Sequence, residues 1–82
     1  MTARGKWPWT VWTRDGERCR HFRTFAGAEA YARRYVEAAL RDTGGCLPAE
    51  IDRDRVPVAW VRADGLERIW TDMVADAAGL VA

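Results

Sequence analysis

Residues 9–22 read WTVWTRDGERCRHF, and this stretch predicts the first structural unit of the chain. WTVWT and RCRHF are typical of β-strands, and the Asp15-Gly16 pair between them is a strong signal for a two-residue hairpin turn. Such a turn sets a register of three cross-strand pairs, namely Trp9 with Phe22, Val11 with Arg20, and Trp12 with Cys19.

This register divides the hairpin between two faces, because side chains alternate along a strand. One face receives Trp7, Trp9, Val11 and Phe22. The other face receives Thr10, Trp12, Cys19 and His21. A single hairpin cannot bury both faces against one helix, so either another element covers the second face or Trp12 is partly exposed.

The next segment, residues 25–41, reads FAGAEAYARRYVEAALR and predicts the longest helix of the chain. Thr24 is a natural N-cap, and strong helix formers dominate the segment. Apolar residues recur at helical spacing on one stripe, which comprises Phe25, Ala28, Ala32, Tyr35, Val36, Ala39 and Leu40. The opposite face carries a ladder of charges, Glu29, Arg33, Glu37 and Arg41. The DTGG sequence at residues 42–45 ends the helix.

The second half of the chain predicts another hairpin. Residues 46–55, CLPAEIDRDR, read as a loop that has room for a turn of helix after Pro48. VPVAWVR and LERIWT flank the ADG turn at residues 63–65. The expected cross-strand pairs are Trp60 with Ile69 and Arg62 with Glu67. Residues 72–78 then predict a short helix with acidic residues in its first turn.

These elements predict an α+β fold that forms a single domain over residues 1–82. We expect an antiparallel sheet of about four strands from two β-hairpins, packed by one long and one short helix in the order ββα-ββα. Trp9, Trp60 and Trp70 are expected to fill the core, because the helix stripe is rich in small alanines.

Composition indicates a small globular protein, with 82 residues of which 49% are hydrophobic and 30% charged. No apolar run approaches the roughly 18 residues of a membrane span, and no signal-peptide pattern opens the sequence. We therefore expect a cytoplasmic protein with no membrane partner. Cys19 and Cys46 lack a C-x-x-C spacing and His21 is the only histidine, so we expect neither a metal nor a cofactor.

Catalysis is not expected either. The chain has no Ser, Asn or Gln, which removes much of the side-chain chemistry of enzymes and of base readout. Cys19 and His21 share a strand face, but side chains at i and i+2 stand roughly 7 Å apart, which is long for activation of a nucleophile.

Charge is distributed unevenly along the chain. Residues 1–41 hold nine basic and four acidic side chains, whereas residues 42–82 hold four basic and eight acidic ones. This asymmetry predicts two surfaces of opposite sign, unless the two halves neutralise each other within the fold.

Residues 5–41, GKWPWTVWTRDGERCRHFRTFAGAEAYARRYVEAALR, resemble the arm-type, AP2-like N-terminal DNA-binding domain of phage and transposon integrases. Such domains have a tryptophan, basic strands around a glycine turn, and then Phe-x-Thr at the start of an alanine-rich helix with Glu-Ala. The matching positions are Trp9 or Trp12, Gly16, Arg18, Arg20, Phe22, Thr24, Glu29 and Ala30. The resemblance implies that the basic residues of the strands contact DNA.

A binding protein is the function that the sequence favours. Trp and Arg are the residue types that most often dominate protein interfaces, and the chain holds five Trp. The candidate binding residues are Trp7, Trp12, Arg14, Arg18, Arg20, His21 and Arg23. A second, acidic patch consists of Glu50, Asp52 and Asp54.

Two kinds of partner fit these residues. We expect a protein partner, so that the chain acts as a protein-binding adaptor or inhibitor of the kind carried by phages or mobile elements. The alternative is a DNA-binding or recombination accessory protein that uses the Arg- and Trp-rich hairpin. The pI of about 7.8 is below the value above about 9 that is typical of a dedicated nucleic-acid-binding domain, which favours the protein partner.

Overall fold

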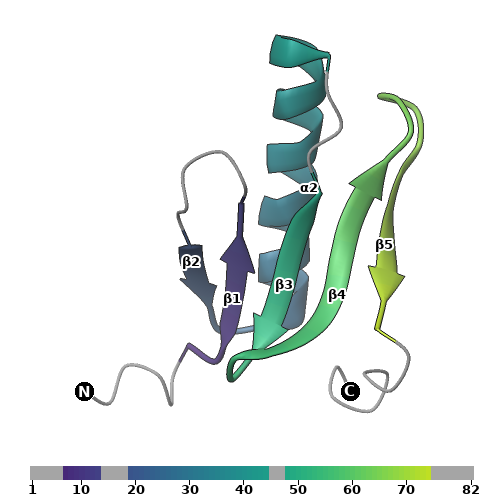
Figure 1. Cartoon of the computed structure of the whole chain (residues 1–82). Helices are drawn as coiled ribbons and strands as arrows, with labels where there is room; N and C mark the ends of the chain where they lie inside the picture. Colours follow the sequence, from purple (N-terminus) through teal and green to yellow (C-terminus); the bar gives the residue numbers. More distant parts are fainter. Residues whose placement is uncertain (1–6, 14–18, 45–47, 75–82) are drawn as a thin grey trace.

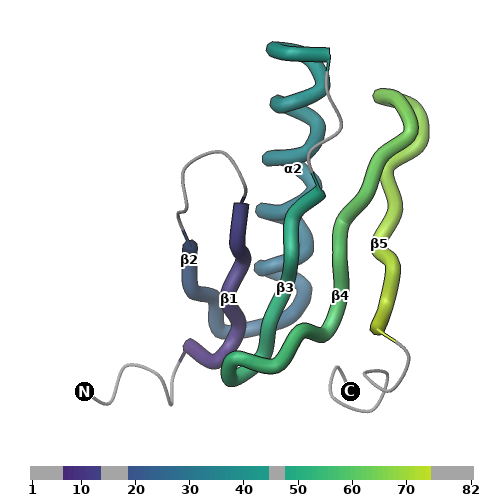
Figure 2. The backbone as a smooth tube through the Cα atoms, viewed as in Figure 1, coloured from purple at the N-terminus to yellow at the C-terminus, as the bar shows by residue number. Residues whose placement is uncertain are grey.

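The computed structural model describes residues 7–13, 19–44 and 48–74, which form a five-stranded antiparallel sheet and one helix (Figure 1). In chain order the elements are β1 (Trp9–Trp12), β2 (Cys19–Phe22), α2 (Phe25–Thr43), β3 (Ala49–Arg53), β4 (Val56–Ala63) and β5 (Ile69–Met73). The strands lie in the order β2-β1-β3-β4-β5, so β2 and β5 are the two edges (Figure 2). The α+β class is confirmed, but the sheet has five strands instead of about four.

The first hairpin has the predicted register. Trp9 pairs with Phe22, Val11 with Arg20 and Trp12 with Cys19. Trp9 and Val11 are buried, whereas Trp12 is 43% exposed. The predicted turn at Asp15-Gly16 lies outside the described residues. Trp12 is thus partly exposed, which was one of the two alternatives that the sequence left open.

The predicted long helix is confirmed and extends two residues further, to Thr43. The Thr24 side chain accepts a hydrogen bond from the Gly27 backbone N–H at 3.1 Å, as an N-cap does. Gly44 follows the helix with a φ of 72° and donates its N–H to the Leu40 carbonyl. Both ends of α2 are therefore defined by local sequence.

One face of the sheet packs against α2. The helix contributes small side chains, with Ala28, Ala32 and Val36 buried, and this lets it lie close to the strands. From the sheet, the same core cluster includes Val11, Ile51, Val58, Ala59 and Val61, all at 0% exposure. Trp9 is part of this core as predicted, but Trp60 and Trp70 are not.

The segment expected to be a loop before residue 56 contains a strand instead. β3 lies at the centre of the sheet and pairs antiparallel with β1 on one side and β4 on the other. Ala49 and Ile51 are buried on the helix side. The carboxylates of Glu50 and Asp52 gave the segment the polarity of a loop, although AEIDR alternates as a half-buried strand does.

The second hairpin has a different register from the predicted one. Trp60 pairs with Asp72, Arg62 with Trp70 and Ala63 with Ile69. The turn extends beyond the ADG turn expected at residues 63–65, because Asp64 donates its backbone N–H to the Arg68 carbonyl and Arg68 donates its own to the Gly65 carbonyl. Residues that were expected inside the β5 strand thus belong to this loop.

The short helix predicted over residues 72–78 is wrong at its start, because Asp72 and Met73 belong to β5. Residues 75–78 lie outside the described residues. Within the part of the chain that the structure describes, the order is therefore ββαβββ and not ββα-ββα. No described helix is both long and apolar enough to cross a membrane.

Candidate functional site

The sheet face opposite α2 carries large aromatic and charged side chains. The cross-strand pairs align Cys19, Trp12, Glu50, Trp60 and Asp72 in one row across all five strands. A second row holds His21, Thr10 and Asp52. Trp70 lies beside Arg62 on the same face and is 37% exposed. We call this surface the open face, because no described helix or strand covers it (Figure 1).

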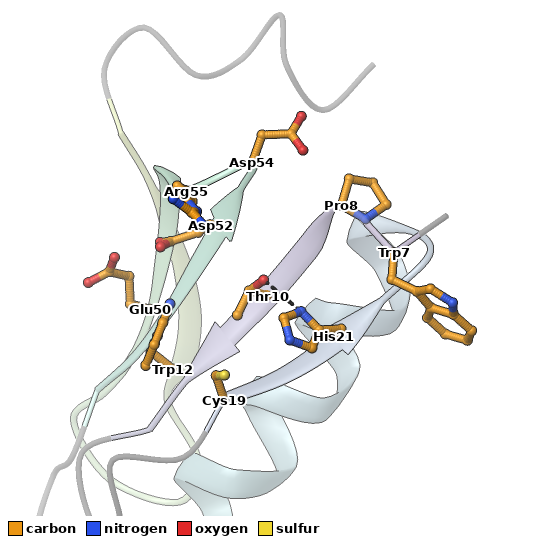
Figure 3. A pocket seen from close by; sticks show the side chains of 10 residues that line it. All are labelled: Trp7, Pro8, Thr10, Trp12, Cys19, His21, Glu50, Asp52, Asp54 and Arg55. Atoms are coloured by element: carbon orange, nitrogen blue, oxygen red, sulfur yellow. Dashed lines mark hydrogen bonds between the residues drawn. The ribbon is translucent and has the colours of Figure 1, made fainter. Parts of the chain in front are cut away.

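Part of the open face is hollowed, with a volume of about 1010 Å³. Thr10, Trp12, Cys19 and His21 line the hollow from the first hairpin, and Glu50 and Asp52 line it from β3 (Figure 3). Trp7, Pro8, Asp54 and Arg55 also line it, at the end where β1 begins and β3 finishes (Figure 3). The alternation of β1, β2 and β3 explains why these side chains meet, since all point away from the helix.

The two carboxyl groups of β3 interact with each other. A hydrogen bond to Asp52, partial burial and the negative charge of Asp52 raise the pKa of Glu50 from 4.5 to about 7. Asp52 is 7% exposed, and its Oδ1 atom is buried without a hydrogen-bond partner. Among the described residues, no ion pair joins a basic side chain to either carboxylate. The hollow therefore holds two interacting carboxyl groups that form no ion pair with a described basic side chain, although Arg55 also lines it.

His21 and Thr10 form the polar wall opposite these carboxylates. The Thr10 hydroxyl and the His21 Nδ1 atom are 3.1 Å apart and form a hydrogen bond (Figure 3). Cys19 is exposed on the same face as His21, as the hairpin register predicted. Among the described residues, no three His, Cys, Asp or Glu side chains gather closely enough to hold a metal ion.

Arginine side chains stack on most of the tryptophans. The guanidinium carbon lies 4.7 Å from the ring centre for Arg23 on Trp7, 5.4 Å for Arg53 on Trp9, and 5.5 Å for both Arg62 on Trp60 and Arg68 on Trp70. These distances are those of cation–π contacts. Trp12 is the one tryptophan over which no guanidinium of the described residues lies.

The structure unites residues that the sequence assigned to two separate patches. Trp7, Trp12 and His21 line the same hollow as Glu50, Asp52 and Asp54. Arg20 and Arg23 do not line it. The Arg20 guanidinium lies 5.2 Å from the Tyr31 ring of α2, on the helix side of the sheet, and Arg23 stacks on Trp7. Arg14 and Arg18 lie outside the described residues.

Sequence reasoning missed four residues of the open face, namely Trp60, Arg62, Trp70 and Asp72. Arg62 binds Asp72 Oδ2 at 3.1 Å while its guanidinium covers Trp60. The signal was present in the alternation of W-V-R at residues 60–62 and W-T-D at residues 70–72. Trp60 and Trp70 were instead expected in the core, because the small alanines of the helix stripe leave space that large indoles could fill.

No protein-family model, curated protein or solved structure matches this chain. The resemblance to integrase arm-type domains thus remains a prediction, and any function has to be argued from the site itself.

Proposed function

We propose that this chain is a non-enzymatic binding protein that docks a protein partner on its open face, as an adaptor or inhibitor of the kind carried by phages or mobile elements. The observation that carries the proposal is the set of three tryptophans, Trp12, Trp60 and Trp70, on a sheet face that no described element covers. Large aromatic side chains gain most when a partner removes them from water.

The arrangement has the features of a protein interface. Trp and Arg are enriched among interface residues that dominate binding energy, and here the guanidinium groups of Arg62 and Arg68 lie 5.5 Å from the ring centres of Trp60 and Trp70. An indole has only two side-chain torsions to fix, so it loses little conformational freedom on binding. The carboxylates of Glu50 and Asp52 lie between Trp12 and the second hairpin, so the open face complements a partner with basic side chains.

DNA binding, the alternative, finds less support. Glu50, Asp52 and Asp54 line the hollow of the open face, where they would repel phosphates. The two described arginines that were predicted to contact DNA, Arg20 and Arg23, stack on Tyr31 and Trp7. A phosphate contact would have to compete with these aromatic contacts.

The test is capture of a partner by the immobilised chain and by two variants. Trp12→Ala removes an open-face indole, and Leu66→Ala is the matched control because Leu66 is 50% exposed in the β4–β5 loop, outside the hollow. We expect the wild type and Leu66→Ala to retain the same protein after nuclease treatment and at raised salt, and Trp12→Ala to lose it. Equal retention by Trp12→Ala, or loss of the partner after nuclease treatment, would contradict the proposal.

A further inference from the structure

We propose that the hollow binds the guanidinium group of an arginine side chain that a partner protein presents, stacked on Trp12 and held by the carboxylates of Asp52 and Glu50. This inference rests on the proposed function and names the chemical group that the open face recognises. It is carried by three features of the hollow, which come from β1, from β3 and from the turn after β3.

The first feature is the contrast between Trp12 and the other tryptophans. Each of the other four has an arginine of this chain within 5.5 Å of its ring centre. Trp12 is 43% exposed, lines the hollow, and has no such partner among the described residues. A guanidinium plane stacks well on an indole. Trp12 can therefore form with a partner's arginine the cation–π contact that the other four tryptophans form with arginines of this chain.

The second feature is the carboxylate of Asp52. Its side chain is nine-tenths buried, lines the hollow and has an Oδ1 atom with no hydrogen-bond partner (Figure 3). A buried acceptor without a donor is unfavourable, and more so when it is charged. Glu50 lies two residues away on the same strand and pairs directly with Trp12. The two carboxylates and the indole are thus neighbours, which is the arrangement that a stacked and doubly hydrogen-bonded guanidinium requires.

The third feature is the turn between β3 and β4. Asp54 and Arg55 both line the hollow and both have positive φ, 50° and 72°. Asn, Asp and Gly are the residues that usually occupy a two-residue turn of this kind, with Gly at the second position. Arg55, at the second position, therefore has a backbone conformation that suits it poorly, and strain of this kind is common beside binding sites.

These features favour an arginine over other cations. A divalent metal ion needs several oxygen or nitrogen ligands, and the described residues offer no group of three that could hold one. A lysine ammonium could pair with the carboxylates, but it is more strongly hydrated and lacks the planar fork that binds a carboxylate while it stacks on a ring. We therefore assign the guanidinium as the occupant.

The experiment uses two small probes, N-acetyl-arginine amide and its neutral isostere N-acetyl-citrulline amide. Binding is followed by the NMR shift of the Trp12 indole N–H in the full chain. We expect the arginine probe to bind with a Kd on the order of 1 mM and to shift Trp12. Asp52→Asn should weaken it by about tenfold or more, and the control Asp64→Asn, which alters an exposed loop carboxylate, should leave it unchanged.

Several outcomes would overturn the inference. Equal binding of the citrulline probe would mean that charge is not recognised, and equal binding by Asp52→Asn would place the cation elsewhere. If only an Arg14→Ala, Arg18→Ala variant bound the probe, the occupant would be the chain's own arginine and not a partner's. Capture of the protein partner by Asp52→Asn but not by Trp12→Ala would leave the docking face in place and refute only the guanidinium site.

Discussion

The two faces of the sheet differ in the size and charge of their side chains. The face under α2 is built from small aliphatic residues, and Val11, Ile51 and Val61 are completely buried there. The open face carries the large indoles of Trp12, Trp60 and Trp70 together with the carboxylates of Glu50 and Asp52. The helix side thus holds small aliphatic side chains together with Trp9, whereas Trp12 and Trp70 on the open face remain exposed.

The largest expected effect is on the helix side. Ile51→Ala removes the largest of the fully buried side chains, beside α2, and we expect it to lower the free energy of unfolding by about 2–4 kcal/mol. Denaturant unfolding, followed by circular dichroism, measures this change. The control Val56→Ala alters a 52% exposed residue at the start of β4 and should change stability by less than about 0.5 kcal/mol. A similar small change for Ile51→Ala would show that the core lies elsewhere.

An opposite sign is expected at Asp52 on the open face. An amide at position 52 carries no charge and can donate a hydrogen bond to Glu50, so Asp52→Asn removes the repulsion between the two carboxylates. We expect the variant to be more stable than the wild type by about 1–2 kcal/mol at pH 8. The midpoint of denaturant unfolding measures this, with Asp64→Asn as the control at an exposed loop position. A loss of stability would indicate that Asp52 has a structural role that the comparison of faces overlooks.

The pH dependence of the free energy of unfolding should also report on the open face, through the raised pKa of Glu50. Folded Glu50 keeps its proton up to about pH 7, whereas the unfolded chain releases it near pH 4.5. Between these values the folded state binds more protons, so this group's contribution makes the free energy of unfolding fall as the pH rises. Because Glu50 is only partly buried, solvent screening should limit the loss to on the order of 1 kcal/mol.

The measurement compares the wild type with Glu50→Gln from pH 4.5 to pH 7. The difference in stability between the two proteins should shift in favour of Glu50→Gln as the pH rises. Glu67→Gln, at an exposed position of the β4–β5 loop, should stay parallel to the wild type. Parallel curves for Glu50→Gln as well would mean that the carboxyl pair is not coupled.

How far the sequence predicts this fold depends on the distance over which each signal acts. The register of the first hairpin follows from the Asp15-Gly16 pair, and the start of α2 follows from Thr24, because both signals involve neighbouring residues. The position of β3 beside β1 depends on contacts between segments far apart in the chain. Local patterns do not encode such pairing, and the acidic residues of AEIDR made the strand look like a loop.

The second hairpin shows how a small error in register hides a site. The observed pairing of Trp60 with Asp72 instead of Ile69 is a shift of an odd number of residues. An odd shift exchanges the two faces of one strand relative to the other. It was therefore not apparent from the sequence that Trp60 and Trp70 share the open face with Trp12, although the alternation of the first hairpin had already placed Trp12 on the face opposite Trp9.

The smallest expected effect concerns the turn at the end of the hollow. Arg55 has a φ of 72°, a conformation that glycine adopts without steric cost. We expect Arg55→Gly to stabilise the fold by about 0.5 kcal/mol, since relief of strain exceeds the extra freedom that glycine gives the unfolded chain. Thermal unfolding measures this, and Gly44→Ala, at a position with the same φ after α2, should have the opposite sign. If Arg55→Gly instead lowered stability, the Arg55 side chain would stabilise the fold by more than its backbone strain costs.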